Sequence, residues 1–278
     1  MTAQPALERS GPVGVPQAPK DKQPGDKRRR TAAERLEVGG LLLAPLLIAA
    51  LAGLLAFYHR SLDLENAVRQ QSSALDWGDK LWPQMQQHII ISALSTALVI
   101  VVAVPLGVLL TRKVMRRVAP GALTVANIGQ ALPAFGLLIV GVTFMGLGRD
   151  TVIVMLAIYA LLPVLRNTMV GLDAVDRNVI EAGRGMGLTR MQVLLKIELP
   201  LAVPVIVAGI RTAMIINIGM ATLAYAIGGG ALGVTISSGL KNQQDPVLII
   251  GSGLVAVVAL SFDWLGAVSE RYLKPRGI

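Results

Sequence analysis

The chain has 278 residues, of which 53% are hydrophobic and only 15% are charged. Because soluble domains carry about 25% charged residues, this composition excludes an ordinary soluble domain and indicates an integral membrane protein. Cysteine is absent and the two histidines, His59 and His88, lie far apart in the sequence, so we expect no disulfide, no metal site and no cysteine nucleophile.

Residues 1–38 differ from the rest of the chain. They are rich in proline, glycine and charge and lack apolar periodicity, which predicts a disordered basic cytoplasmic tail. The run Lys27-Arg28-Arg29-Arg30 is interpreted first as the positive charge that retains the tail in the cytoplasm. The alternative is a contact with anionic lipid headgroups.

Six apolar runs follow the tail, each about 20 residues long, which is the length that spans the bilayer core as a helix. We therefore expect an all-α membrane protein with about six transmembrane helices. Several runs contain proline, which membrane helices tolerate when neighbouring groups satisfy the freed carbonyls. The predicted spans are 39–58, 87–111, 121–146, 151–170, 199–225 and 247–266.

The basic residues outside the spans are unevenly divided between the two sides of the membrane. One side receives eight in the tail, four in the loop 112–120, five in the loop 166–198 and three at the C-terminus. The loops on the other side hold five. Because Lys and Arg are enriched in cytoplasmic loops, this division predicts that both termini are cytoplasmic. It also explains the net charge of +9 without a nucleic-acid partner.

The long loop between the fourth and fifth spans carries its own helix signals. Asp176 is suited to cap a first helix, and Gly187 is suited to end it in the left-handed region. Thr189 and Gln192 have the capping-box spacing that starts a second helix, and Pro200 suits the first turn of the next span. Two short helices with a bend between them would either dock on a partner or lie on the membrane surface, and the spacing alone does not separate these alternatives.

This loop resembles the signature loop of permease subunits of binding-protein-dependent ABC importers. The family pattern is Glu-Ala-Ala, three residues, Gly, nine residues, Ile, one residue and Leu-Pro. Gly183 departs from it, because the family usually has Ala there, and we expect this change to loosen the first helix. The matching residues are Glu181, Ala182, Gly187, Ile197, Leu199 and Pro200.

The resemblance implies a type I ABC importer permease fold. It places a five-helix core over 85–270, with a coupling loop at 173–200, and leaves 39–58 as an added peripheral helix. In the family this loop docks on a separate ATPase. The residues thereby implied in ATPase coupling are Glu181, Ala182, Gly183, Arg184, Met186, Gly187, Leu199 and Pro200.

The resemblance also implies partners and a location. Segments 158–168, 208–213 and 216–219 are similar to the osmoprotectant branch of the family. The expected setting is the bacterial cytoplasmic (inner) membrane, with two ATP-binding subunits, a second permease subunit, identical or paralogous, and an extracytoplasmic substrate-binding protein. The sequence contains no G-x-x-x-x-G-K-[ST] motif, so we expect no cofactor in this chain, with ATP and Mg²⁺ bound by the partner ATPase.

Polar groups interrupt the last two spans. Arg211 and Asp263 are isolated opposite charges, which are costly in a membrane unless paired or hydrated. One hypothesis is a structural ion pair; the other is that Arg211 extends to water while Asp263 lies at the interface. Asn217, Thr222 and Tyr225 lie on or near a face of small residues on the fifth span, which we interpret first as helix packing and second as part of a translocation path.

The sequence Gly228-Gly-Gly-Ala-Leu-Gly233 matches a dinucleotide-binding pattern, but it follows a membrane helix rather than a strand. We therefore interpret it as a flexible outer loop or gate. The chain offers no nucleophile–base pair, so we predict no catalytic residue and no enzyme activity. The main hypothesis is a permease subunit of an ATP-driven importer for compatible solutes such as glycine betaine, choline, carnitine or proline. The alternatives are an ABC permease for another small solute such as an amino acid, and an ion-coupled secondary transporter.

Overall fold

The computed structural model describes residues 24–273, with side chains from residue 41 onward. Throughout that range the regular elements are helices, and residues 24–273 contain no β-strand. The chain divides into two units, Met1–Gly40 and Leu41–Ile278, and the packing described below belongs to the second unit. The part of the predicted tail before residue 24 lies outside the described residues.

Helix α1 (Pro24–Ser61) begins well before the first apolar run. The prediction of disorder over 1–38 is therefore wrong for residues 24–38. The reason is local composition, because Arg, Ala, Glu and Leu are strong helix formers and they supply most of residues 28–36. This stretch joins directly to the apolar run, so one helix continues through both.

Between residues 24 and 273, six stretches are apolar enough to cross a membrane when each bent helix pair counts as one, and four of them are unbroken. The unbroken stretches include the second half of α1 and the helices α3 (Trp82–Thr111), α10 (Leu199–Ala221) and α12 (Asp245–Leu273). The fold is thus the predicted all-α arrangement, with six spans when each bent helix pair counts as one. The bent pairs are α4 (Ala119–Ala131) with α5 (Ala134–Met145), and α6 (Arg149–Tyr159) with α7 (Leu161–Asp173).

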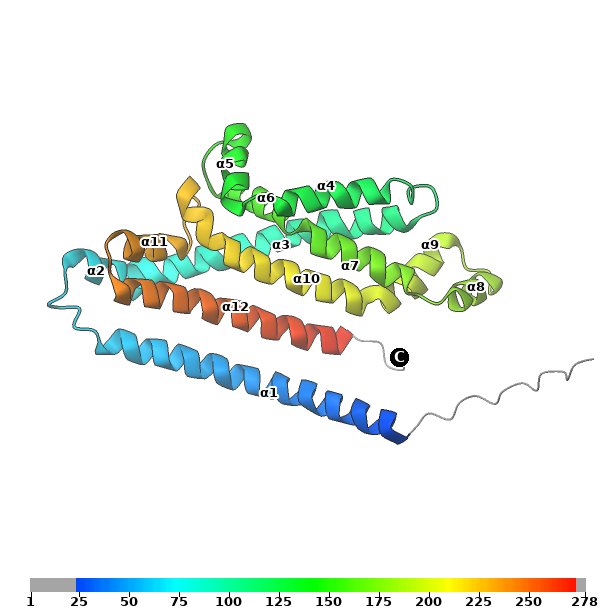
Figure 1. The fold of residues 1–278 in the computed structure, drawn as a ribbon, viewed down its shortest axis with the longest axis horizontal. Helices are drawn as coiled ribbons and strands as arrows, with labels where there is room; N and C mark the ends of the chain where they lie inside the picture. Colours follow the sequence, from blue (N-terminus) through cyan, green and yellow to red (C-terminus); the bar gives the residue numbers. More distant parts are fainter. Residues whose placement is uncertain (1–23, 274–278) are drawn as a thin grey trace, which may run out of the picture. The chain divides into compact units, whose positions relative to one another are not determined.

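A bend of 102° between α4 and α5 is the largest departure from the predicted spans. Pro133 lacks an N–H and disfavours helical backbone at the residue before it. Leu132 is accordingly extended, with φ −66° and ψ 141°. The span predicted over 121–146 therefore consists of two helices, and α5 turns away from the direction of α4 (Figure 1).

Helices α3, α7 and α10 pack together along their lengths and form the centre of the bundle (Figure 1). Gly107 of α3 lies against Thr168 of α7, and Gly209 of α10 lies against Asn167 of α7. A Cβ atom at either glycine would come within 2.7 Å of an α7 side chain, so glycine permits this close approach. The buried apolar residues around these contacts include Val99, Ala103, Leu110, Val164, Leu165 and Ala213.

Short helices lie at both ends of the bundle (Figure 1). The end that we call the α8 end carries α8 (Arg177–Gly185), α9 (Arg190–Val193) and the π-turn η2 (Leu194–Glu198). The opposite end, called the α11 end, carries α2 (Arg69–Ala74), the π-turn η1 (Trp77–Leu81), the 3₁₀ segment η3 (Thr222–Ile227) and α11 (Gly233–Lys241).

From Leu41 onward α1 packs on α12 along one narrow stripe. The Trp264 Nε1 donates a hydrogen bond to the Leu41 carbonyl at 2.9 Å, and the Leu55 side chain lies directly against Gly253. The remaining faces of α1 are open, and the Phe57 side chain is 72% exposed. This is the packing expected of a helix at the edge of a bundle.

Candidate coupling loop and charge cluster

Helix α8 is bounded by the two caps that the sequence predicts. At its start the Asp176 carboxylate accepts a hydrogen bond from the Asn178 N–H at 2.8 Å. At its end Gly187 has φ +85° and donates its N–H to the Arg184 carbonyl at 2.9 Å, while the next N–H donates to the Gly183 carbonyl at 3.2 Å. These two bonds form a Schellman motif, so the predicted bend at Gly187 is confirmed.

The second helix of the loop continues into α10 without a break. The Thr189 hydroxyl accepts the Gln192 N–H at 3.3 Å, and the Gln192 side chain accepts the Thr189 N–H at 2.9 Å, which confirms the capping box. From there α9, η2, α10 and the 3₁₀ segment η3 form one continuous segment over Arg190–Ile227. The chain widens into a π-turn just before Pro200, because a proline ring would meet the carbonyl four residues earlier in a regular α-helix.

Gly183 allows α8 to pack closely on the continuous helical segment that follows it, which runs from α9 through η2 into α10. A Cβ atom at this position would lie 2.5 Å from Cδ1 of Ile197, and the side chains of Leu188 and Val193 surround the same point. The expectation that glycine here loosens the first helix is therefore wrong. Its missing side chain instead lets α8 rest directly on η2.

The outer surface of α8 is a mixed basic and apolar patch. Among the residues implied in ATPase coupling, Gly183 is buried and Leu199 is partly buried, whereas the others are exposed. Large apolar side chains are exposed beside them, including Met186 at 75% and Met191 at 62%. Exposed apolar groups gathered around charged ones are typical of an interaction surface, and this one lies at the α8 end.

An ion pair that sequence reasoning missed joins this loop to α3. The Arg112 Nη2 donates to Oε2 of Glu198 at 2.6 Å, and the Glu198 side chain is only 7% exposed. Glu198 occupies the unspecified position of the family pattern, between Ile197 and Leu199. Its partner is 86 residues away in the chain, and no local signal links the two.

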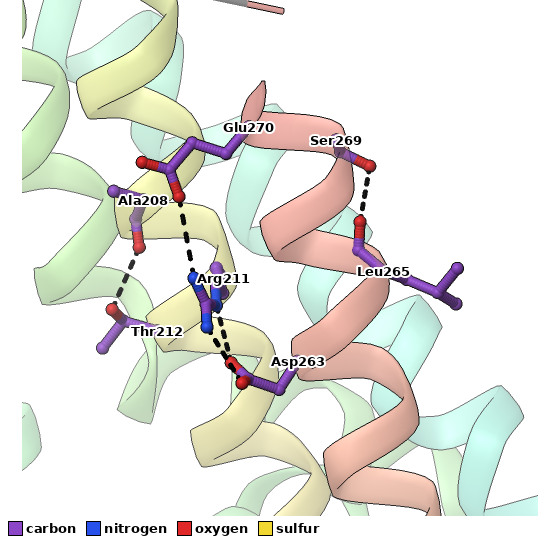
Figure 2. Close-up of polar contacts among 7 residues, drawn as sticks. All are labelled: Ala208, Arg211, Thr212, Asp263, Leu265, Ser269 and Glu270. Atoms are coloured by element: carbon purple, nitrogen blue, oxygen red, sulfur yellow. Dashed lines mark hydrogen bonds and ion pairs between the residues drawn. The ribbon is translucent and has the colours of Figure 1, made fainter. Parts of the chain in front are cut away.

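A charge cluster joins α10 to α12 (Figure 2). The Arg211 guanidinium donates to both carboxylate oxygens of Asp263, at 2.6 and 2.9 Å. Glu270, one further pair of turns along α12, lies 3.7 Å from Arg211, and the Arg211 side-chain stem lies over Gly266. The structure thus brings together the two charges paired in the first hypothesis and adds a second carboxylate.

The three path candidates do not share one surface. Asn217 is fully buried, and its amide lies 3.0 Å from the Thr96 hydroxyl of α3, so its surroundings favour the packing interpretation. Thr222 donates its hydroxyl to the Gly219 carbonyl at 2.7 Å. Tyr225 lies with its ring 5.8 Å from the Lys241 ammonium. A nearby apolar pocket is lined by other residues, among them Leu138, Met155, Tyr159, Met220 and Leu223.

The glycine-rich segment 228–233 is packed against α3, which contradicts the expectation of a flexible loop. The Gln87 side-chain oxygen accepts the Ala231 N–H at 3.1 Å, and Ala231 and Leu232 are fully buried. Gln84 likewise accepts the Thr235 hydroxyl at 2.7 Å. Two glutamines of α3 therefore fix the connection between η3 and α11.

Each histidine binds a distant backbone carbonyl. The His59 Nε2 lies 2.8 Å from the Leu75 carbonyl, and the His88 Nε2 lies 2.9 Å from the Ile218 carbonyl. The second contact has a clear cause, because α10 tightens into η3 and the Thr222 N–H bonds to Gly219 instead of Ile218. His88 supplies the donor that this change withdraws. Within the described part of the chain, no three ligating side chains gather into a metal site.

Comparison with known proteins agrees with this geometry. Residues 103–275 match the family described as binding-protein-dependent transport system inner membrane component. The chain is 42% identical over 201 residues to the glycine betaine/carnitine/choline transport system permease protein OpuCB of Bacillus subtilis, which covers 72% of this chain and 92% of that protein. It is 43% identical, with the same coverage, to the choline transport system permease protein OpuBB of Bacillus subtilis.

Further similarities extend to another organism and to solved structures. The chain is 38% identical to the osmoprotectant import permease protein OsmW of Salmonella typhimurium, over 69% of this chain and 91% of that protein. A chain of the MetNI methionine ABC transporter, in inward facing conformations, matches with a TM-score of 0.61 and 24% identity, over 70% of this chain and 96% of that chain. This second likeness shows the fold, a type I ABC importer permease.

The family model and the relatives therefore decide between the classes of transporter left open by the sequence. Proteins of this family work with a separate ATPase and with a substrate-binding protein. With its capped α8, its unbroken connection into α10 and a match over residues 103–275, the chain belongs to the family of binding-protein-dependent ABC importer permeases, as an inner membrane component.

Proposed function

We propose that the chain is the permease subunit of an ATP-driven importer for compatible solutes, with glycine betaine, choline and carnitine as its substrate class. The observation that carries the proposal is the 42–43% identity to OpuCB and OpuBB across 92% of each protein. Proline and other amino acids are the alternative cargo. The similarity to a methionine transporter concerns only the fold, so it does not favour an amino acid as the cargo.

The proposed orientation places the α8 end in the cytoplasm, with both termini on that side. Its support is the division of basic residues, since the loops assigned to the α8 end carry most of the Lys and Arg outside the spans. In this orientation the exposed patch around Met186 and Met191 faces the ATPase. Glu181, Ala182, Arg184, Met186 and Gly187, all exposed, would then lie in the docked surface, and Gly183, Leu199 and Pro200 would connect it to α10.

The proposed assembly contains two ATP-binding subunits, a second permease subunit, identical or paralogous, and an external binding protein. ATP and Mg²⁺ belong to the ATPase in this arrangement. Closure of the ATPase subunits would move α8, and the continuous helical segment from α9 to α10 would transmit that movement through Leu199 and Pro200. Thr222 and Tyr225, at the far end of the same segment, are the proposed polar contacts of the path.

The small number of aromatic rings near the proposed path bears on which subunit selects the solute. Quaternary ammonium groups are held tightly by several aromatic rings together, whereas the described membrane helices place only scattered rings, such as Tyr159 and Tyr225, near the end of α10. We therefore assign the selection of the solute to the external binding protein. The permease supplies a route that binds the solute weakly and releases it.

Transport by the assembled complex tests the proposal. The permease, its ATPase and its binding protein would be reconstituted in liposomes, with ATP on the ATPase side and radiolabelled glycine betaine, choline or carnitine on the other. The expected result is uptake that requires ATP and persists with an uncoupler. Uptake of only amino acids would replace the proposed cargo, and uptake that collapses with the proton gradient would refute ATP-driven transport.

A further inference from the structure

A buried carboxylate lies at the point where the coupling loop joins the membrane. Glu198 is the last residue of η2, and its side chain is 7% exposed. The ion pair with Arg112, at 2.6 Å, satisfies it. A carboxylate in such a place is costly unless it is paired, so this contact is needed whenever Glu198 is charged.

Arg112 is itself held by the helix that it ends. It is the C-cap residue of α3, and its Nε donates to the Val108 carbonyl in the last turn at 3.2 Å. This second bond holds the guanidinium on the last turn of α3, while its Nη2 reaches Glu198 of η2. Because the guanidinium bonds to both elements, it ties the end of α3 to the exit of the loop.

The neighbouring contact at the start of the loop is weaker. Arg116 lies 3.5 Å from Asp173 at the end of α7, and these side chains are 60% and 46% exposed. Exposed pairs of this kind contribute little. The turn between α3 and α4 therefore touches both ends of the loop, but only the Arg112–Glu198 contact has a buried carboxylate, with Glu198 7% exposed and Arg112 36% exposed.

We propose that Arg112 is a positioning residue that makes α3 follow the coupling loop. This proposal rests on the proposed function. Movement of α8 reaches η2 through the contact of Gly183 with Ile197, and it reaches α10 because the backbone is continuous. Through Glu198 it also reaches α3, which packs on α6, α7 and α10. Without the Arg112–Glu198 pair, a displacement of α8 would move α10 more than it moves α3.

The first experiment measures solute transported per ATP hydrolysed in the reconstituted complex. We expect Arg112→Gln and Glu198→Gln each to lower this ratio about tenfold, while ATP hydrolysis per assembled complex stays within about twofold of wild type. The charge swap Arg112→Glu with Glu198→Arg should return the ratio to within about threefold. Arg117→Gln, an exposed arginine in the same turn, is the matched control and should leave the ratio unchanged.

The outcomes separate the alternatives. A smaller amount of assembled complex with an unchanged ratio would show a merely structural role and overturn the proposal, as would single variants that match Arg117→Gln. A wild-type complex that transports none of the three solutes would instead refute the proposed function.

A second measurement does not depend on transport. The chain has no cysteine, so Val114→Cys and Leu195→Cys, both at exposed positions, allow spin labels on the α3–α4 turn and on η2. We expect one narrow distance distribution that stays the same when ATP binds, because the two elements move together. Glu198→Gln should broaden or shift it on ATP binding. An unchanged distribution in that variant would overturn the proposed tie.

Discussion

The ion pair between Arg211 and Asp263 can be tested by removing one charge. Breaking a fully buried pair costs about 3–5 kcal/mol, and an exposed pair is worth about 0–1 kcal/mol. The two side chains here are 31% and 34% exposed and bind in a bidentate fashion. We therefore expect Asp263→Asn to lower the free energy of unfolding by about 2 kcal/mol, because the carboxylate that remains beside Arg211 is Glu270, at the longer distance of 3.7 Å.

Thermal unfolding of the detergent-solubilised permease provides the assay. A loss of about 2 kcal/mol corresponds to a Tm lower by about 6 °C for a chain of this size. Ser269→Ala is the control, because it removes an exposed hydroxyl from the same helix (Figure 2) and should leave Tm unchanged. The swap Arg211→Asp with Asp263→Arg should recover about half of the loss. An Asp263→Asn protein that melts with the wild type would refute the reasoning.

Three further predictions concern backbone contacts. Gly187→Asp should abolish transport and reduce binding to the ATPase, because position 187 has φ +85° and a side chain there costs about 1–2 kcal/mol. Pull-down with the ATPase measures the loss of binding, and normal solute uptake by the variant would contradict the prediction. Gly183→Ala should lower stability by about 1–3 kcal/mol through overpacking against Ile197, and adding Ile197→Val should relieve it; a Gly183→Ala protein with unchanged Tm would show that the contact yields freely. His88→Phe should cost about 1–3 kcal/mol, because the Ile218 carbonyl loses its donor; equal Tm values for the two proteins would contradict this.

Local chemistry explains which parts of the loop could be predicted. A helix cap depends on residues within one turn of the backbone, so the capping roles of Asp176, Gly187 and Thr189 can be recognised from the local sequence. The passage from α9 into α10 also has a local cause, because the π-turn η2 just before Pro200 accommodates the proline ring without breaking the helix. These features required no knowledge of the rest of the fold.

Features that depend on packing could not be predicted in the same way. The Arg112–Glu198 pair joins residues 86 positions apart, and only the assembled bundle shows that Glu198 is buried. The 228–233 segment has the composition of a flexible loop, but Gln87 of α3 binds Ala231 within it, and Gln84 binds Thr235 just after it. The bend at Pro133 is an intermediate case: proline signals a break, yet its 102° angle is set by the helices around it.

The polar contacts of α10 explain how a displacement at its α8 end would be transmitted to its far end. Glu198, just before α10, binds α3 through Arg112, and Asn217, near its far end, binds α3 through Thr96. At 1.5 Å per residue these two contacts lie about 28 Å apart, nearly the thickness of the hydrocarbon core. Between them Arg211 holds α10 to α12. Since α10 is bound to α3 near both of its ends, it cannot bend away from α3 without breaking one of these polar contacts. Helices α3 and α10 would therefore move together and carry a displacement from the α8 end to Thr222 and Tyr225.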